Sequence, residues 1–384
     1  MKAVVLKLVS GFLVVALSGC SPASTPGPGA QTPGNGGGDR VLFGVHAAEA
    51  NTAAEYAAKL DRAAALGLAA VRVPVDWAQL EPDAPGAFDA AYLDELKTRV
   101  ADARERGLGV VVLFAQSPGW ASGHPEEPGY PPDTGHLEDY ARALVRLADA
   151  LESAGPVLAW EVWNEPNSTG FWPAYEGRER DGTYVLVPLE AAAEYAALLK
   201  AAYSAMKQTH PQAVVLGGSL ASADVAYLEA LWRAFSDTVP MDALALHPYA
   251  RVDERAGPHY GYAQYPDQCN EDIDDLSPPW CFGRGLEIVR DFLKAQGFDR
   301  PLWLTEFGVS SADAWGDAGS EAEQAKHLAI AVEILQRRGG ADDLNVAAAL
   351  WYRLDDEDED RFGLYRADGS LKPAGARLAE LAGR

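Results

Sequence analysis

The sequence predicts an α/β fold, a (β/α)₈ barrel formed by a single domain, from three observations. Short apolar runs alternate with longer amphipathic, alanine-rich segments in eight successive pairs. Strict alternation predicts parallel strands, and strands that are apolar throughout predict burial on both faces. About 345 residues follow residue 39 without a second linker, a length typical of one barrel. A doubly wound open sheet is the alternative, but no glycine-rich phosphate loop follows the first strand.

The strands are predicted from continuous apolar runs bounded by turn residues. They comprise residues 41–46, 70–75, 108–115, 157–163, 213–217, 241–247, 301–306 and 346–351. The helices are predicted from the amphipathic pattern that follows each run. They comprise residues 52–66, 89–106, 136–154, 188–209, 224–237, 284–296, 320–338 and 373–382. The order along the chain is therefore eight βα units.

Residues 1–19 have the pattern of an export signal. Lys2 and Lys7 flank an apolar run, Leu8 to Leu17, that is too short to span a bilayer. The run ends in Leu17-Ser18-Gly19-Cys20, which resembles the lipobox of bacterial lipoproteins. That resemblance implies cleavage before Cys20 and a diacylglycerol on its thiol. The alternative is an ordinary signal peptide with an incidental cysteine.

Residues 20–39 are rich in proline, glycine and small polar residues, and we expect them to be a flexible tether. Residues 40–384 would then form the barrel domain. The combination predicts an exported, membrane-anchored lipoprotein of the cell envelope, periplasmic or at the cell surface. Ser21 resembles the sorting signal of outer-membrane lipoproteins, so which membrane holds the anchor stays open.

The charge of the chain limits its binding partners, and its cysteine content bears on a disulfide. The chain has 56 acidic and 32 basic residues, an excess that repels nucleic acid and anionic lipid head groups. We expect a monomer that binds a neutral polymer and contacts the membrane only through its N-terminal lipid. Cys269 and Cys281 lie in one loop of an exported chain, which favours a disulfide over two free thiols.

Two glutamates follow predicted strands. Glu165 comes in Trp163-Asn164-Glu165-Pro166, after the fourth strand, and Glu306 ends the seventh, before Phe307-Gly308. Carboxyl ends of barrel strands meet at one face, so the two carboxylates can share a cleft. Facing carboxylates are the groups needed to cleave a glycosidic bond: one protonates the leaving oxygen, and the other attacks the anomeric carbon or activates water.

Other polar and aromatic side chains gather at the same strand ends. They include His46, Arg72, Asp76, Gln116, Trp120, Asn164, His247, Tyr249 and Trp351. Seven of the ten tryptophans also lie at strand ends or in the loops that follow them: Trp77, Trp120, Trp163, Trp172, Trp280, Trp315 and Trp351. Sugar rings stack on indole, so this rim suits a sugar polymer, although some of these rings would cap the barrel core instead.

These motifs resemble the clan A glycoside hydrolases, whose acid/base follows the fourth strand and whose nucleophile follows the seventh. Further matches are the segments Val71 to Trp77, Ser117 to Ala121, His247-Pro248-Tyr249 and Phe362 to Tyr365. The Pro-x-Trp-Ala at 118–121 is most similar to family 39, which we favour, whereas Thr305-Glu306-Phe307-Gly308 is equally similar to family 5. Gln116 stands where family 5 usually has a histidine, which argues against a family 5 substrate mode.

The resemblance implies a role for each residue. Glu306 would be the nucleophile, kept ionised by Arg72, and Glu165 the acid/base. Asn164 would hydrogen-bond the sugar 2-hydroxyl, and Tyr249 would donate to Glu306. His247 would hold the sugar or its neighbours, and Trp351 would form the floor of the subsite for the sugar being cleaved. Trp120 and His46 would add substrate contacts, although His46 could instead be satisfied at the barrel rim.

Two further groups have non-catalytic interpretations. Glu161 lies inside the fourth strand and is expected to support the barrel through a hydrogen bond or salt bridge, for example with Arg72. The run from Asp355 to Asp360 is expected to be a solvated acidic loop rather than a calcium site, because consecutive carboxylates cannot all converge on one ion. The remaining histidines show no metal-ligand spacing, so we expect no catalytic metal and no cofactor.

The sequence thus predicts a retaining glycoside hydrolase that cleaves a β-linked polysaccharide or oligosaccharide, with endo action favoured. The alternatives are a non-catalytic sugar-binding barrel and a transglycosylase that uses the same site. The sugar and its linkage are not predicted. The long loop 248–283 carries several tyrosines together with Cys269 and Cys281, and loops of this length are usually functional.

Overall fold

The computed structural model describes residues 40–47, 52–172, 178–180, 183–185, 188–235, 238–249, 282–312, 319–357 and 361–382. The predicted export signal, Cys20, the tether and the Cys269–Cys281 disulfide lie outside these residues and stay predictions. Among the described helices none is both long enough and apolar enough to cross a membrane.

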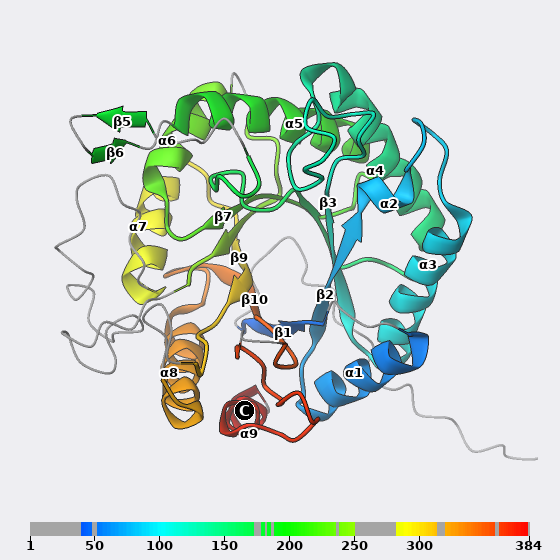
Figure 1. Cartoon of the computed structure of the whole chain (residues 1–384). Helices are drawn as coiled ribbons and strands as arrows, with labels where there is room; N and C mark the ends of the chain where they lie inside the picture. The colour runs from blue at the N-terminus through cyan, green and yellow to red at the C-terminus, as the bar shows by residue number, and fades with distance from the viewer. Residues whose placement is uncertain are drawn as a thin grey trace, which may run out of the picture.

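The described strands form a closed parallel barrel in the order β1-β10-β9-β8-β7-β4-β3-β2 (Figure 1). Their bounds are β1 Leu42–His46, β2 Ala70–Asp76, β3 Gly109–Ala115, β4 Ala159–Val162, β7 Val215–Ala221, β8 Ala243–His247, β9 Leu302–Phe307 and β10 Val346–Trp351. Each of the eight predicted strands is present within a few residues of its expected bounds. The predicted (β/α)₈ barrel is therefore confirmed.

The helices surround the barrel (Figure 1). Those predicted are α1 Ala53–Ala65, α3 Ala90–Glu105, α4 Leu137–Glu152, α5 Pro188–Thr209, α6 Val225–Ala234, α7 Phe282–Ala295, α8 Glu321–Arg338 and α9 Pro373–Ala382. Additional short elements are α2 Trp77–Leu80, the 3-10 turn Thr134–His136 and an antiparallel hairpin of β5 Arg178–Arg180 with β6 Thr183–Val185. They are too short for periodicity to reveal.

Burial of the strands on both faces explains why each strand has a continuous apolar sequence. All seven residues of β3 and all six of β9 are buried, because helices cover the outer face and side chains fill the interior. Helix starts follow from capping residues: the side chains of Thr52, Asp89, Asp224 and Ser320 each accept a hydrogen bond from a backbone N–H of the first turn. The sequence pattern and the caps together determine the bounds.

The carboxyl end of β4 is held against β7 by its own loop. The amide nitrogen of Asn167 donates to the Ala221 carbonyl at 2.9 Å, and the Asn167 amide oxygen accepts from the Ala221 N–H at 2.9 Å. The Glu165 N–H donates to the Ser219 carbonyl at 3.0 Å. These bonds allow Trp163 and Glu165 to keep left-handed φ angles of 68° and 41°, which non-glycine residues rarely adopt and which cluster at functional sites.

The acidic run after β10 is neutralised where it is described. Asp355 is 8% exposed and pairs with Arg62 at 2.7 Å and with Lys59 at 3.6 Å. Asp356 pairs with the buried Lys372 at 2.9 Å. The expectation of a solvated acidic loop is therefore wrong for Asp355 and Asp356, because basic side chains from α1 and from the start of α9 cover them. Residues 358–360 lie outside the described part.

Lys372 ties the loop after β9 to the loop after β10. Its Nζ donates to Asp356 Oδ1 at 2.9 Å, to Ser311 Oγ at 3.0 Å and to the Arg361 carbonyl at 3.1 Å. Removing one partner of a buried ion pair leaves an uncompensated charge. We expect Lys372→Met to lower the free energy of unfolding by about 3 kcal/mol, measured by urea denaturation.

The matched control is Lys326→Met, which breaks an exposed pair with Glu323 on α8. That change should lower the free energy of unfolding by no more than about 1 kcal/mol. Equal losses in the two variants would show that the buried lysine is not what holds these loops.

Candidate active site

A buried ion pair lies inside the barrel. Arg72 of β2 and Glu161 of β4 have side chains with 0% exposure, and Arg72 Nε donates to Glu161 Oε2 at 2.6 Å. Burial alone would lower the pKa of Arg72 and raise that of Glu161. The attraction between them, together with Glu306 acting on Arg72 and His247 acting on Glu161, outweighs burial and shifts both pKa values the other way. Both groups stay charged, so the pairing of Glu161 with Arg72 expected from sequence is present.

Glu306, at the end of β9, is held as an anion. One of its oxygens accepts from Arg72 Nη1, and the other accepts from the Tyr249 hydroxyl at 2.7 Å, as the sequence led us to expect. Burial by itself would raise the pKa of Glu306, but the positive charges of His247 and Arg72 dominate and hold the pKa at about 2. This carboxylate is therefore ionised at neutral pH.

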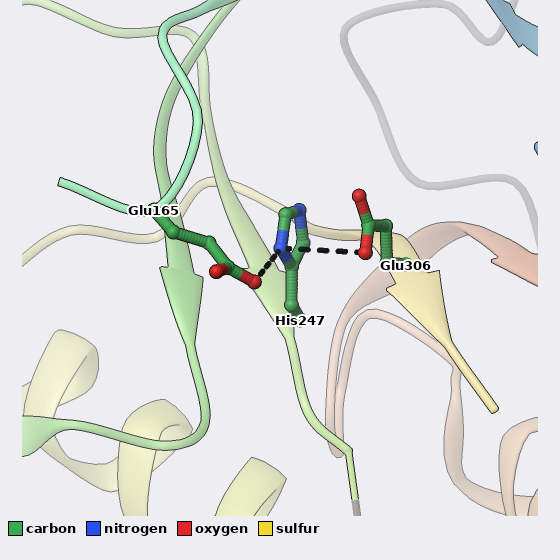
Figure 2. Close-up of side chains that lie close together, drawn as sticks. All are labelled: Glu165, His247 and Glu306. Atoms are coloured by element: carbon green, nitrogen blue, oxygen red, sulfur yellow. Dashed lines mark hydrogen bonds and ion pairs between the residues drawn. The ribbon is translucent and has the colours of Figure 1, made fainter. Parts of the chain in front are cut away.

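Glu165 and Glu306 face each other across His247, which ends β8 (Figure 2). His247 Nδ1 lies 2.8 Å from Glu165 Oε1 and 3.8 Å from Glu306 Oε2. One oxygen of each carboxylate and one ring nitrogen all lie within 4.8 Å of one another. The Glu165 side chain is 18% exposed, so part of its carboxylate remains open to a ligand.

His247 is a link between protein groups rather than a surface for sugar. Its side chain is 0% exposed, and its Nε2 lies 3.1 Å from the Thr305 hydroxyl. Burial alone would lower its pKa, but the charge of Glu306 and the contacts with Glu161 and Glu165 raise the pKa to about 9. The expectation that His247 holds the sugar directly is therefore wrong, because the ring is enclosed by carboxylates; it can hold only the sugar's neighbours.

Asn164 is oriented by the same arginine. Arg72 Nη2 donates to Asn164 Oδ1 at 3.1 Å. With its oxygen occupied, the amide can offer its N–H₂ group to a ligand. This is the geometry that a donor to a sugar hydroxyl needs, so the structure is compatible with the role expected for Asn164.

Trp351 is not placed as expected. It is 0% exposed, its indole N–H donates to the Phe362 carbonyl at 2.9 Å, and it packs edge-to-face on Phe307. The expectation that the Trp351 ring forms the floor of a subsite is wrong, because its contacts with Phe362 and Phe307 hold the ring inside the protein core. The next residue, Tyr352, is the partly exposed ring at this strand end and was missed from sequence.

Tyr352 belongs to an aromatic cluster beside Glu306. Its ring centre lies 5.3 Å from that of His46, 6.1 Å from that of Tyr249 and 5.6 Å from that of Phe362. His46 therefore packs against Tyr352 at the barrel rim, where it is 9% exposed. A sequence signal existed in the dipeptide Trp351-Tyr352, but period-two alternation cannot decide which ring faces the core at an irregular strand end.

Trp120 lies at another part of the barrel mouth, after β3, which β1 and β2 separate from β10. Its indole N–H donates to the Glu81 carbonyl at 2.8 Å, and its ring packs edge-to-face on Trp77 at 5.4 Å and on His136 at 5.5 Å. The ring is partly exposed, which is compatible with the substrate contact expected from the sequence. In the part of the chain that the structure describes, Trp120 forms no hydrogen bond with either glutamate.

The donor atoms of Glu165, His247 and Glu306 could in principle hold a metal ion. Two features of the site oppose a divalent cation. The charge of Glu306 is already matched by the Arg72 guanidinium, and His247 would have to give up a proton whose pKa is raised to about 9. The absence of a metal and of a cofactor therefore stays our prediction.

Residues 35–351 match the sequence profile described as Cellulase (glycosyl hydrolase family 5). The chain belongs to glycosyl hydrolase family 5. Of the two families that the motifs resemble, the match therefore supports family 5, although Pro118 to Ala121 favoured family 39. No curated protein matches the chain.

Solved glycosidases share the fold of this family 5 chain. A family 39 glycoside hydrolase from the gut symbiont Bacteroides cellulosilyticus WH2 matches with a TM-score of 0.65 and 21% identity, over 90% of this chain and 64% of that chain. A GH5_18 protein from Streptomyces cattleya in complex with GlcNAc matches with a TM-score of 0.62 and 20% identity, over 90% and 80%. The exo-beta-1,4-mannosidase Op5Man5 from Opitutaceae bacterium strain TAV5 matches with a TM-score of 0.60 and 19% identity, over 89% and 59%.

His247 should make the stability of the fold depend on pH. Its pKa is raised from 6.5 to about 9, so the native state holds a proton that the unfolded chain releases above 6.5. Its contribution to stability is complete below pH 6.5 and should be lost as pH rises to about 9, by about 3 kcal/mol in total. Urea denaturation of the protein and of His247→Asn between pH 6 and 9.5 measures this slope.

The matched control is His210→Asn, since His210 is a surface residue beside Asp149. It should keep the wild-type slope, whereas His247→Asn should flatten it. If the slope of His247→Asn equalled that of the wild type, the native proton would not be on the His247 cluster.

Metal ions should leave the site unaffected. A cation bound only by the native state would raise the melting temperature by mass action. Millimolar calcium, zinc, magnesium or EDTA should shift it by no more than about 1 °C. A rise that saturates with one equivalent of an ion, and that Glu306→Gln abolishes, would contradict the prediction of a metal-free centre.

Proposed function

We propose that this protein is a retaining glycosidase that hydrolyses β-linked glycans, with Glu306 as nucleophile and Glu165 as acid/base. The observation that carries the proposal is the spacing of the two carboxylates, whose nearest oxygens lie within 4.8 Å of one another. Retaining enzymes place their carboxyl groups about 5 to 5.5 Å apart, while inverting enzymes need about 6.5 to 9.5 Å to admit a water molecule.

In the first step Glu306 attacks the anomeric carbon as the bond to the leaving oxygen breaks. The electron pair of that bond goes to the leaving oxygen, which takes the proton of Glu165, so an ester to Glu306 and a free hydroxyl result. Arg72 and Tyr249 each occupy one Glu306 oxygen, which keeps the carboxylate ionised and aimed before the sugar arrives.

In the second step Glu165 acts as a base. It takes a proton from water, the hydroxide attacks the anomeric carbon, and Glu306 leaves as a carboxylate, which restores the enzyme with retained configuration. The Glu306 ester has no negative charge, so the charged imidazole of His247 is then free to stabilise the ionised Glu165 at 2.8 Å. The asymmetric partners of the two glutamates therefore suit two different roles.

The family and the aromatic rim support a proposal for the substrate class. Aromatic rings beside Glu306 and an acidic chain favour an uncharged sugar. The GH5_18 structures with Manb1-4GlcNAc and the exo-beta-1,4-mannosidase make β-mannosides the first class to test. Endo action on a polysaccharide stays the expectation from sequence, as does anchoring of a monomer in the cell envelope through Cys20.

Two other functions use the same cleft. A transglycosylase would transfer the Glu306-bound sugar to an acceptor sugar in place of water, and product analysis at high acceptor concentration distinguishes it. A binding barrel without catalysis is disfavoured, because binding requires neither a carboxylate held ionised nor a second one beside it.

The roles of the two glutamates predict different mutant behaviour. Glu306→Gln should abolish turnover of all β-glycosides. Glu165→Ala should lower kcat on an unactivated glycoside by about 10² to 10⁴-fold but spare the first step on a dinitrophenyl glycoside, whose leaving group needs no proton. Steady-state kinetics on a panel of aryl glycosides, together with ¹H NMR of the first anomer released, checks both roles and the retention.

A carboxylate far from the cleft provides the control, since Glu229→Gln alters only an exposed pair on α6. It should match the wild type on every substrate. Equal losses of Glu165→Ala on activated and unactivated substrates would refute the acid role, and an inverted first product would refute the nucleophile role.

A further inference from the structure

Glu161 is fully buried below the cleft, yet it contacts both Arg72, which bonds Glu306, and Thr305, which contacts His247. Its side chain is 0% exposed and lies in β4, four residues before Glu165. Three donors surround it: Arg72 Nε on Oε2 at 2.6 Å, and the hydroxyls of Ser219 at 2.7 Å and Thr305 at 2.6 Å on Oε1. A fully satisfied, buried anion of this kind fixes the direction of every hydrogen bond around it.

Through Thr305, Glu161 determines which nitrogen of His247 carries a hydrogen. A hydroxyl has one hydrogen, and the Thr305 hydrogen is directed to Glu161 at 2.6 Å. Towards His247 Nε2, 3.1 Å away, the Thr305 oxygen can therefore only accept. Nε2 must consequently carry a hydrogen in every protonation state of the ring, which excludes one of the two neutral tautomers.

The other ring nitrogen then has two possible states. If the imidazole is charged, Nδ1 donates to Glu165 Oε1 at 2.8 Å, and a proton on the second Glu165 oxygen is free to reach the cleft. If the imidazole is neutral, Nδ1 can only accept, so a protonated Glu165 directs its proton to Nδ1 from Oε1, into the barrel and away from the cleft. The charge of His247 thus decides in which direction Glu165 offers its proton.

We propose that Glu161 is a positioning residue that, through Thr305 and its own negative charge, keeps His247 in the charged form that turns the Glu165 proton towards the substrate. The inference rests on the proposed function, in which Glu165 is the acid. Glu161 does not touch substrate in this scheme. It acts on Glu165 through His247, and on Glu306 through Arg72.

The charges that surround His247 support this arrangement. On one side of the ring, Glu161 Oε1 lies 3.8 Å from Nε2. On the other side, Glu165 Oε1 lies 2.8 Å and Glu306 Oε2 lies 3.8 Å from Nδ1. The hydroxyl of Tyr249, two residues further along the chain, bonds the same Glu306 oxygen. The opposing cation is Arg72, whose Nη2 lies 3.5 Å from Nε2. Two cations this close repel, and Glu161 contacts both, so its loss would favour loss of the His247 proton.

The test is the pH dependence of kcat/KM on a β-glycoside, compared among four variants. Glu161→Gln keeps the shape of the side chain but removes the charge, and should move the alkaline limb to lower pH by about one unit or more. Thr305→Val removes the acceptor for Nε2–H and should shift the limb in the same direction. Thr305→Ser restores the hydroxyl and should restore the wild-type limb.

Ser219→Ala is the matched control. It also removes one hydrogen bond from Glu161 Oε1, but it leaves the contact between Thr305 and His247 in place. Its alkaline limb should stay at the wild-type pH even if its rate falls. A lower rate in all variants, with an unmoved limb in each, would mean that Glu161 merely supports the barrel, and the inference would be overturned.

A second readout needs no turnover. The ¹⁵N chemical shifts of His247, assigned by comparison with His247→Asn, report the charge of the ring and the nitrogen that keeps its proton. We expect a charged ring at pH 7.5 that becomes Nε2–H on deprotonation, and deprotonation at lower pH in Glu161→Gln and Thr305→Val. A neutral Nδ1–H ring would overturn the inference.

The two readouts separate the two proposals. If the wild type hydrolysed no glycoside, the proposed function would fail while the ¹⁵N titration still decided the protonation of His247. If Glu161→Gln did not fold, as judged by near-ultraviolet circular dichroism, the comparison of Thr305→Val with Thr305→Ser would decide the inference alone.

Discussion

The structure of the site depends on one buried cation, Arg72. Its guanidinium lies inside the barrel and contacts Glu161 from β4, Glu306 from β9 and Asn164 from the loop after β4. Burying an unpaired charge is strongly unfavourable, so Arg72 and the two carboxylates stabilise one another's charged forms, while the Asn164 amide accepts a further guanidinium hydrogen. Arginine suits this position because its planar group offers several donors in fixed directions and stays protonated in a buried place. Three parts of the barrel mouth are thereby held in one arrangement.

Around this cation the two glutamates receive different surroundings. Glu306 is paired with Arg72 and Tyr249, which favours a permanent anion, whereas Glu165 contacts the His247 ring at 2.8 Å and is partly exposed. An acid and a nucleophile of the same residue type can work together only if their environments differ in this way. The difference arises from where the partners lie: Arg72 of β2 and Tyr249 after β8 bond Glu306, whereas His247 at the end of β8 lies closer to Glu165 than to Glu306.

Much of the site could be predicted because it follows strand ends. Glu165 and Glu306 are recognisable from sequence, since each stands at the end of a buried strand, and parallel barrel strands all end at one face. The pairing of Arg72 with Glu161 was also predictable, because a buried charge within a strand needs an opposite charge. His247, Trp351 and Tyr352 were not, because whether a ring faces the core or the cleft depends on local twist and on neighbouring loops rather than on spacing along the chain.

The sequence by itself determined the architecture of this protein. Eight apolar runs and eight amphipathic segments leave a chain few ways to bury its strands, and a closed parallel barrel satisfies them all. Only the tertiary structure decided that the acidic residues Asp355 and Asp356 are neutralised by Arg62, Lys59 and Lys372, and that Thr305 links Glu161 to His247. These contacts join residues far apart in the chain. Their geometry depends on a few ångströms of side-chain placement, which hydrophobic patterning does not encode.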